Sequence, residues 1–162
     1  MKISVIDLFP FFKAQASAMG WKPFRTPLLW QKSESEGLAP CGREGPRHVY
    51  EMIFFATKGN KGLLQSPIDI LTEKRVPRHL RRYGAEKPIP LLRRLIECST
   101  IPGDRVLDPC CGSGTTLAAC RELGRKALGI EIEEAAYNLA VVAAERDPYS
   151  DPEQSNSEES DD

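Results

Sequence analysis

Arg105-Val-Leu-Asp-Pro-Cys-Cys-Gly-Ser-Gly-Thr-Thr116 carries the strongest structural signal in the chain. A short apolar strand leads into Asp108 and then into a loop whose glycines, Gly112 and Gly114, leave room for a ligand to approach the backbone before a helix begins. The segment Lys126-Ala-Leu-Gly-Ile-Glu131 follows and predicts a second strand that ends in a carboxylate. A carboxylate at the end of a strand, about 20 residues after such a loop, can accept hydrogen bonds from ribose hydroxyls. This pattern predicts a nucleotide-type cofactor loop.

Regular secondary structure is predicted on both sides of this loop. Pro88 suits the start of a helix, because its missing N–H falls among the donors that a first turn leaves unpaired, and the apolar spacing from Leu91 to Ile96 continues it as an amphipathic helix. Further helices are predicted over residues 115–123 and 133–146, and strands over residues 105–108 and 126–132. Because helices and strands alternate, we expect a parallel sheet with helices on its faces.

Residues 1–84 carry weaker signals. Residues 3–6 alternate in polarity and predict a short strand, and residues 8–19 predict a helix that Gly20 can terminate. Residues 24–30 and 48–56 are rich in side chains that favour strands, and the polar residues between them predict a long loop. Residues 66–84 show no clear period, so we expect a loop that leaves room for short elements.

The composition is that of a globular protein. The chain has 162 residues, of which 41% are hydrophobic, and residues 1–146 are long enough for one domain with its own core. No apolar run approaches the roughly 20 residues that span a bilayer, so we expect a soluble, cytoplasmic chain without a membrane segment. Five cysteines and two histidines occur without the spacing of a zinc site, so we expect reduced thiols and no metal.

The net charge of −1 hides a division along the chain. Residues 145–162 carry eight acidic side chains against one arginine, a charge of −7, so residues 1–144 carry +6. Residues 147–162 are predicted to be a disordered acidic tail, which either solvates the protein or screens its basic region. Much of the positive charge lies between Lys74 and Arg94, where it suits a phosphate backbone or forms a plain solvated face.

Several segments together resemble the amino-methyltransferases that modify DNA with S-adenosylmethionine. They are Asp108 to Thr116, Gly129-Ile-Glu131 and Glu86-Lys-Pro88, joined by Gly20-Trp21, Trp30-Gln-Lys32, Arg47-His-Val-Tyr-Glu51 and Lys58-Gly59. Their order is that of the permuted class in which the cofactor loop lies in the C-terminal half, and the resemblance covers roughly residues 5–146. It implies an α/β fold of three layers, Rossmann-like, with a mostly parallel sheet.

The resemblance also implies roles for individual residues. Asp108, Cys110 and the loop glycines would surround the methionine end of the cofactor, Glu131 would take the ribose hydroxyls, and the Lys-Pro pair would open the helix that closes over the cofactor. The residues implied to bind S-adenosylmethionine are Lys87, Pro88, Asp108, Cys110, Gly112, Gly114 and Glu131. Tyr83 stands where the family usually has a histidine, and no role is carried over to it.

Double-stranded DNA is the partner that the resemblance implies. Basic residues in or near the long polar loop and in the basic segment are candidates for phosphate contacts: Lys32, Arg43, Arg47, Arg78, Arg81 and Arg82. Ordinary surface charge is the alternative reading of each of them.

The family's catalytic tetrad is absent from the sequence. It reads Asp, Asn or Ser, then Pro-Pro, then an aromatic residue, whereas Asp7-Leu-Phe-Pro-Phe-Phe12 has the residue types but not the spacing. In the family the strand bearing the tetrad lies between the strand of the glycine loop and the one predicted at residues 3–6. We therefore expect an incomplete sheet, as in a truncated enzyme or in one half of a split enzyme whose second chain supplies the catalytic half.

Three functions remain open from the sequence. The first is a DNA methyltransferase of restriction-modification type, acting on adenine N6 or cytosine N4 with no catalytic residue assigned in this chain. The second is a non-catalytic remnant or regulator that binds nucleic acid. The third is a small-molecule or protein methyltransferase of the same fold. The sequence matches outside the cofactor loop argue against this third function.

Overall fold

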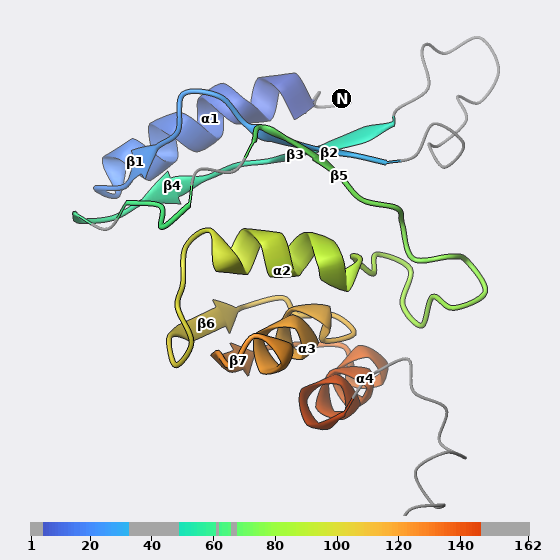
Figure 1. Cartoon of the computed structure of the whole chain (residues 1–162). Helices are drawn as coiled ribbons and strands as arrows, with labels where there is room; N and C mark the ends of the chain where they lie inside the picture. Colours follow the sequence, from blue (N-terminus) through green and yellow to red (C-terminus); the bar gives the residue numbers. More distant parts are fainter. Residues whose placement is uncertain (1–4, 33–48, 61, 66–67, 147–162) are drawn as a thin grey trace, which may run out of the picture. The chain divides into compact units, whose positions relative to one another are not determined.

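The computed structural model describes residues 5–32, 49–60, 62–65 and 68–146 (Figure 1). The predicted acidic tail and most of the predicted long loop lie outside the described residues. The backbone forms two compact units, Met1–Arg75 and Val76–Asp162, and the grouping of residues 1–146 into one domain stays a prediction. Every helix in the described part of the chain is too short or too polar to cross a membrane.

The first unit contains one helix and several short strands. The elements are α1 (Val5–Ala18), β1 (Lys22–Pro23), β2 (Leu28–Gln31), β3 (Tyr50–Ile53), β4 (Ala56–Thr57) and β5 (Ile70–Thr72). β1 pairs with β4, and β2 lies between β3, which is antiparallel to it, and β5, which is parallel. The strands predicted on either side of the long loop are therefore present but shorter, and β5 is one of the short elements for which residues 66–84 left room.

The predicted strand at residues 3–6 is wrong where the structure describes it, because residues 5 and 6 belong to α1. Val5, Phe9 and Phe12 repeat at the spacing of a helix, and this longer pattern outweighs an alternation over four residues. The rings of Phe9 and Phe12 lie with their centroids 5.2 and 5.1 Å from that of Phe54. These contacts hold α1 against the strands of its own unit.

Trp30 and Leu71 are buried at the centre of the first unit. Trp30 Nε1 donates to the carbonyl oxygen of Glu73 over 2.8 Å. Lys32 is also buried, and its Nζ lies 2.6 Å from Oε1 of Glu51 and 5.2 Å from the centroid of the Trp30 ring. An anion and an aromatic face thus compensate the cost of burying this cation.

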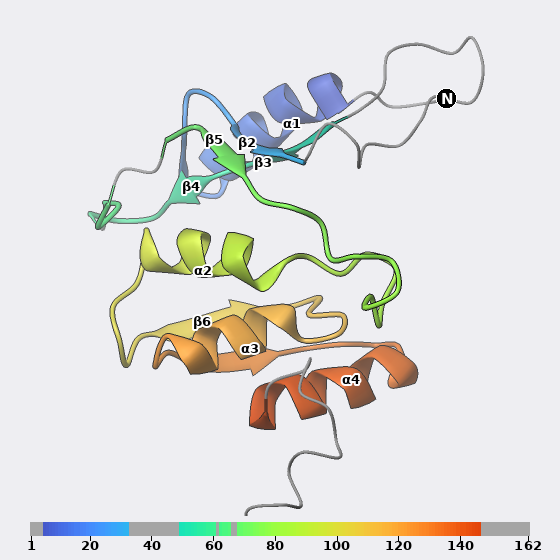
Figure 2. The same cartoon turned by 45° about the vertical axis from the view of Figure 1, so that its right-hand side comes forward.

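The second unit alternates helices and strands as predicted. Its elements are α2 (Ile89–Glu97), β6 (Arg105–Asp108), α3 (Thr115–Glu122), β7 (Lys126–Gly129) and α4 (Glu134–Glu145). β6 and β7 are parallel, in a register that pairs Arg105 with Lys126 and Asp108 with Gly129. α3 packs against β7 and lies alongside both α2 and α4 (Figures 1 and 2). β7 ends three residues earlier than predicted, and Ile130, just beyond it, donates to the carbonyl oxygen of Asp108 and accepts from the N–H of Cys111.

The helices of the second unit enclose its core and cover one face of the strand pair. The buried cluster comprises Ile89, Ile96, Ala118, Ala119, Cys120 and Ala143, with Val106 of β6 packed against it. Leu107 and Leu128 lie on the opposite face of β6 and β7 and are 61% and 63% exposed. The exposed face of this strand pair thus carries two large apolar side chains beside Arg105 and Lys126, and the incompleteness of the sheet stays a prediction.

Candidate functional site

The glycine loop between β6 and α3 has a backbone that other residues would strain. Gly112 and Gly114 have φ values of +54° and +81°, in the left-handed region. A Cβ atom on Gly114 would also lie 2.6 Å from the Cα atom of Ala140 in α4. Gly114 is therefore needed both for its conformation and for the close packing of the loop on α4.

Hydrogen bonds tie the loop to the ends of both strands. The N–H of Cys110 donates to Oδ1 of Asp108 over 3.1 Å, and the N–H of Cys111 donates to the carbonyl oxygen of Ile130 over 3.0 Å. The N–H of Gly114 closes the turn by donating to the carbonyl oxygen of Cys111 over 2.9 Å. The loop is thus a defined turn at the carboxyl edge of the parallel pair, where ligands of such sheets bind.

Glu131 stands beside this loop, just beyond β7. Its Oε2 accepts the N–H of Gly112 over 2.8 Å, and its Oε1 accepts the N–H groups of Ile132 and Glu133, each over 2.9 Å. These backbone donors lower the pKa of the Glu131 carboxyl, the N–H of Glu133 having the largest effect. Glu131 is therefore an ordered, ionised acceptor at neutral pH, and it remains partly exposed.

Tyr83 lies against the loop, a contact that sequence reasoning missed. A Cβ atom on Gly112 would lie 3.3 Å from Cε1 of the Tyr83 ring, and Oη of Tyr83 donates to Oε2 of Glu133 over 3.4 Å. The negative charge of Glu133 is the main cause of a raised Tyr83 pKa, so the phenol stays a donor at neutral pH. The residue type differs from the family's histidine, but the side chain still faces the predicted cofactor loop.

Lys87 and Pro88 stand where α2 begins, as predicted. Pro88 is the N-cap of α2, with φ −67° and ψ 134°, and its side chain is buried. Lys87 is half-buried. Both residues belong to the same unit as the glycine loop.

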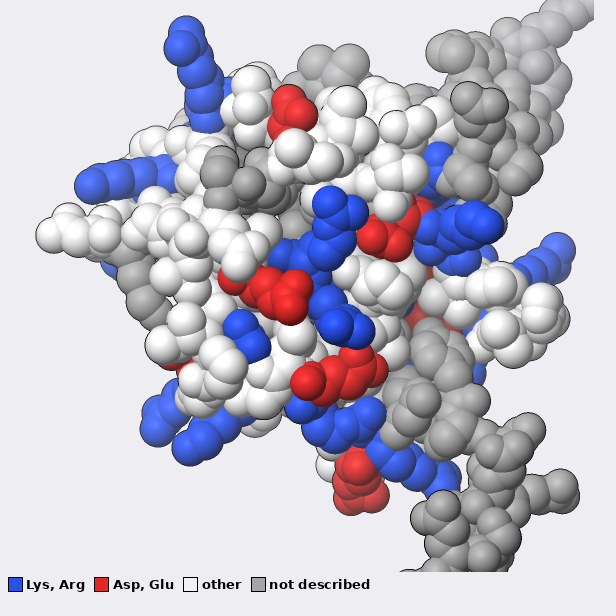
Figure 3. Space-filling model, in the orientation of Figure 1, with Lys and Arg blue, Asp and Glu red and all other residues white. Residues whose placement is uncertain are grey.

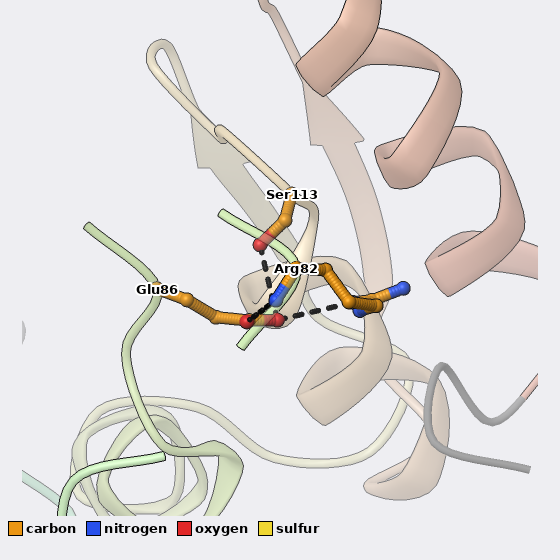
Figure 4. Close-up of polar contacts among 3 residues, drawn as sticks. All are labelled: Arg82, Glu86 and Ser113. Carbon is orange, nitrogen blue, oxygen red and sulfur yellow. Dashed lines mark hydrogen bonds and ion pairs between the residues drawn. The ribbon is translucent and has the colours of Figure 1, made fainter. Parts of the chain in front are cut away.

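Glu86 and Ser113 form a buried polar contact that the sequence did not predict (Figure 4). Glu86 is 7% exposed and Ser113 2%, and Oγ of Ser113 donates to Oε1 of Glu86 over 3.3 Å. Arg82 completes the cluster, because its backbone N–H donates to Oε2 of Glu86 over 2.9 Å and its Nη2 lies 3.2 Å from Oε1. The motif position of Glu86 beside Lys87 was visible in the sequence, but burial of its carboxylate was not.

A groove of about 600 Å³ runs beside β7 and between α3 and α4. Its walls are mainly apolar and include Cys111, Leu117 and Tyr137. None of the seven predicted cofactor residues, all of which the structure describes, lines it. The groove therefore borders the glycine loop at Cys111 but includes none of the predicted cofactor residues.

The predicted DNA contacts differ widely in exposure. Arg78 is exposed, whereas Nη2 of Arg81 donates to the carbonyl oxygen of Val76 over 3.0 Å, and Lys32 and Arg82 pair with glutamates. Arg43 and Arg47 lie outside the described residues. On the face drawn in Figure 3, basic side chains are interspersed with acidic ones. All six assignments stay predictions, and Arg78 is the described residue among them with the freest access to solvent.

The described cysteines form no disulfide with one another. They are Cys98, Cys110, Cys111 and Cys120, and Cys41 lies outside the described residues. Burial raises the pKa of Cys111, which lies inside the glycine loop, so its thiol stays protonated at neutral pH and is a poor nucleophile. Within the described residues, no group of three or more His, Cys, Asp or Glu side chains has the arrangement of a metal site.

Comparison with known sequences identifies similarity to DNA methylases and type II methyltransferases. The sequence profile of a family described as DNA methylase, of N6/N4 type, matches residues 11–142. The chain is 30% identical over 136 residues to the type II methyltransferase M.SmaI of Serratia marcescens, an alignment that covers 75% of this chain and 46% of M.SmaI. The chain spans less than half the length of each of four curated relatives that it matches.

Solved structures show the same fold. The complex of M1.HpyAVI with SAM superposes with a TM-score of 0.74 at 20% identity, covering 89% of this chain and 72% of that one. The cytosine-N4-specific PvuII DNA methyltransferase superposes with a TM-score of 0.70 at 17% identity, covering 95% of this chain and 63% of that one. These matches confirm the predicted α/β, Rossmann-like methyltransferase fold.

Proposed function

The chain belongs to the N6/N4 DNA methylase family, and we propose that its second unit binds S-adenosylmethionine at the glycine loop. The observation that carries this proposal is Glu131, whose carboxylate lies beside the loop and is oriented by backbone N–H groups on both oxygens. The proposed binding residues are those that the family resemblance implied, and all of them lie in this unit.

The residues present suit this cofactor. A carboxylate offers about four acceptor sites, so the backbone bonds to Glu131 leave it able to accept from a hydroxyl. The positive φ of Gly112 turns the loop without a side chain that would block the backbone. The first-turn N–H groups of α3 have no partners within the helix, and this makes them suitable donors to a carboxylate.

Each residue then has a separate task. S-adenosylmethionine supplies an activated methyl group when bound. Glu131 would accept a hydrogen bond from a ribose hydroxyl, and Asp108, Cys110 and the loop backbone would hold the methionine end. Lys87 and Pro88, at the start of α2, close over the cofactor.

We propose methyl transfer to adenine N6 or cytosine N4 of double-stranded DNA as the activity of the enzyme to which this chain contributes. The reaction requires a base that has left the stack and a polar group that accepts from its amine. We assign no residue of this chain to that task, because the tetrad that performs it in the family is absent from the sequence and Asp7 to Phe12 lie within α1. A second chain, or a further segment, that bears the tetrad would complete the site.

Arg78 is the residue that we favour for contact with DNA phosphates, and Lys32, Arg43, Arg47, Arg81 and Arg82 remain predicted contacts. Contacts of this kind make binding salt-dependent, so replacing Arg78 by alanine would weaken DNA binding and reduce its slope against salt by about one unit. We also propose a cytoplasmic location, which suits a DNA-modifying enzyme with free thiols.

Titration of the full chain with S-adenosylmethionine in a calorimeter tests the cofactor assignment. We expect the wild-type chain to bind, and Glu131→Gln to bind about tenfold more weakly because a charged acceptor is lost. Glu134→Gln, an exposed glutamate in the first turn of α4, is the matched control and should bind as the wild type does. A wild-type chain without affinity for the cofactor would refute the proposal.

A non-catalytic module that binds nucleic acid is the second candidate, favoured by the missing tetrad. It predicts salt-dependent DNA binding that is the same with and without cofactor and the same in Glu131→Gln. Transfer of labelled methyl groups to DNA by the isolated chain would exclude it. Competition between DNA and small amines as acceptors would separate both candidates from a small-molecule methyltransferase.

A further inference from the structure

Glu86 is a buried carboxylate in the segment that precedes α2. Its side chain is fully buried, and it accepts hydrogen bonds from the backbone N–H and the guanidinium of Arg82 and from the hydroxyl of Ser113 (Figure 4). Burying a charge is costly unless it is paired and hydrogen-bonded, and this carboxylate is both. The cluster Arg82–Glu86–Ser113 is therefore a built polar contact.

Two carboxylates hold neighbouring residues of the glycine loop. The N–H of Gly112 donates to Oε2 of Glu131 over 2.8 Å, and Oγ of Ser113 donates to Oε1 of Glu86 over 3.3 Å. Glu131 follows β7, whereas Glu86 lies 27 residues before Ser113, ahead of α2. The loop is thus tied at adjacent positions to two different parts of the second unit.

The contact with Tyr83 adds to this second attachment. Tyr83 belongs to the same segment as Arg82 and Glu86, and Cε1 of its ring lies 3.3 Å from the place of a Cβ atom on Gly112. Its hydroxyl donates to Glu133. Glu133 follows the loop in the sequence, whereas Tyr83 and Glu86 precede it. Residues 82–86 therefore contact the loop at both Gly112 and Ser113.

Folding stability alone does not require a buried pair of Arg82 and Glu86 at this place. Exchanging a buried ion pair for well-packed apolar residues is often neutral or stabilising. A hydrogen bond from Ser113 to a fixed carboxylate has a geometric consequence that an apolar contact lacks, because it sets the direction of a loop residue. That residue lies between the two loop glycines, Gly112 and Gly114, whose φ values are positive.

We propose that Glu86 is a positioning residue for the cofactor: together with Arg82 it holds Ser113, and so keeps the glycine loop in the conformation that receives S-adenosylmethionine. This inference rests on the proposed function. Since Lys87 and Pro88 follow Glu86 directly, the same contact sets the start of α2 relative to the loop. Arg82 contributes indirectly, because it fixes the carboxylate of Glu86 that in turn holds Ser113.

Ser113→Ala tests the proposal most directly, because it removes the hydroxyl and leaves the pair of Arg82 and Glu86 in place. We expect about a tenfold loss of affinity for S-adenosylmethionine, measured by calorimetry on the full chain, and faster amide exchange at Gly112 and Ser113 without cofactor. Ser99→Ala is the matched control. Its hydroxyl donates to the carbonyl oxygens of Leu95 and Ile96 at the end of α2, so it should lower stability slightly without a change in affinity.

Glu86→Gln provides a second variant of nearly the same shape, for the case that Ser113→Ala folds poorly. Together with the double variant, the two form a double-mutant cycle. The losses of affinity should be clearly less than additive, because Glu86→Gln leaves Ser113 only a neutral acceptor and Ser113→Ala removes the donor of the same contact. Wild-type affinity in either folded variant, or additive losses in the pair, would overturn the role of Glu86. Failure of the wild-type chain to bind S-adenosylmethionine would instead overturn the proposed function itself, so the two failures are distinguishable.

Discussion

Residues in and beside the glycine loop contribute a left-handed backbone, close packing or a charge. Comparison of several positions separates these contributions. Gly114 combines a φ of +81° with close contact to α4, whereas Gly103 has a φ of +88° with nothing near a Cβ position. Gly84 has neither feature. Glu131 contributes a charge that backbone donors stabilise.

Gly114→Ala should destabilise the second unit strongly. The added Cβ would meet the Cα of Ala140 at 2.6 Å, and a left-handed backbone adds about 1–2 kcal/mol of strain, so we expect a total loss of about 3 kcal/mol or more in the free energy of unfolding. Gly103→Ala isolates the backbone term and should cost about 1 kcal/mol. Gly84→Ala should be neutral or slightly stabilising. Urea denaturation followed by circular dichroism measures all three, and equal costs at Gly114 and Gly103 would contradict the packing argument.

Glu131→Gln should show a pH-dependent loss of stability. The pKa of Glu131 is lowered in the folded chain, so its ionised form contributes stability that is fully present above the ordinary pKa of 4.5 and is lost as the pH falls through the lowered value. The difference in unfolding free energy between wild type and Glu131→Gln should therefore shrink below about pH 4.5. Glu145→Gln, an exposed control at the end of α4, should show no such trend. If the difference in unfolding free energy between wild type and Glu131→Gln stayed constant from pH 7 to pH 3, the folded chain would not stabilise the charge of Glu131.

At the scale of elements, α3 is the centre of the second unit. It packs against α2 and α4 and against β7, and Ala118 and Ala119 on it are fully buried. Small side chains let the helices approach closely, and this in turn brings α4 near Gly114. The ion pair of Arg93 with Glu122, at 3.5 Å between α2 and α3, is largely exposed and adds little.

Ala118→Leu should destabilise the second unit by about 1–3 kcal/mol, because the larger side chain has no space between the helices. Ala135→Leu places the same change on the exposed side of α4 and should stay within about 0.5 kcal/mol of the wild type. Urea unfolding curves with equal slopes would give the comparison. Equal stability of the two variants would mean that α3 is less tightly packed than described.

At the scale of the whole molecule, each of the two units has its own buried centre. Trp30 and Leu71 are buried in the first, and the cluster around Ala118 and Cys120 is buried in the second. Both tryptophans of the chain, Trp21 and Trp30, lie in the first unit. Tryptophan fluorescence therefore reports on one unit, while most of the helical signal comes from the other.

We expect mutations in one core to leave the unfolding of the other unit unchanged. Leu71→Ala should lower the denaturation midpoint seen by tryptophan fluorescence, at a cost of about 2–5 kcal/mol. Ala118→Leu should instead lower the midpoint seen by far-ultraviolet circular dichroism. If both signals shift together in either variant, the chain unfolds as one cooperative body.

Local signals were sufficient to predict α2, β6, α3 and α4, because apolar spacing, Pro88, Gly124 and the loop glycines act over a few residues. The same stretch predicted the family that the profile match identifies. The helical conformation of residues 5 and 6 was not predicted, because the four residues 3–6 fit an alternation and a helix equally well.

Contacts between distant residues became visible only in the tertiary structure. Glu86 meets Ser113 and Tyr83 meets Gly112 because α2 packs on α3 and brings the segment before it to the loop, and no local pattern encodes that distance. The engagement of Lys32 and Arg82 with glutamates is likewise a product of packing. The sequence thus determined which elements and which cofactor chemistry to expect, since these depend on residue type and short spacing. The packed structure decided which side chains hold the loop, since burial and pairing depend on the whole unit.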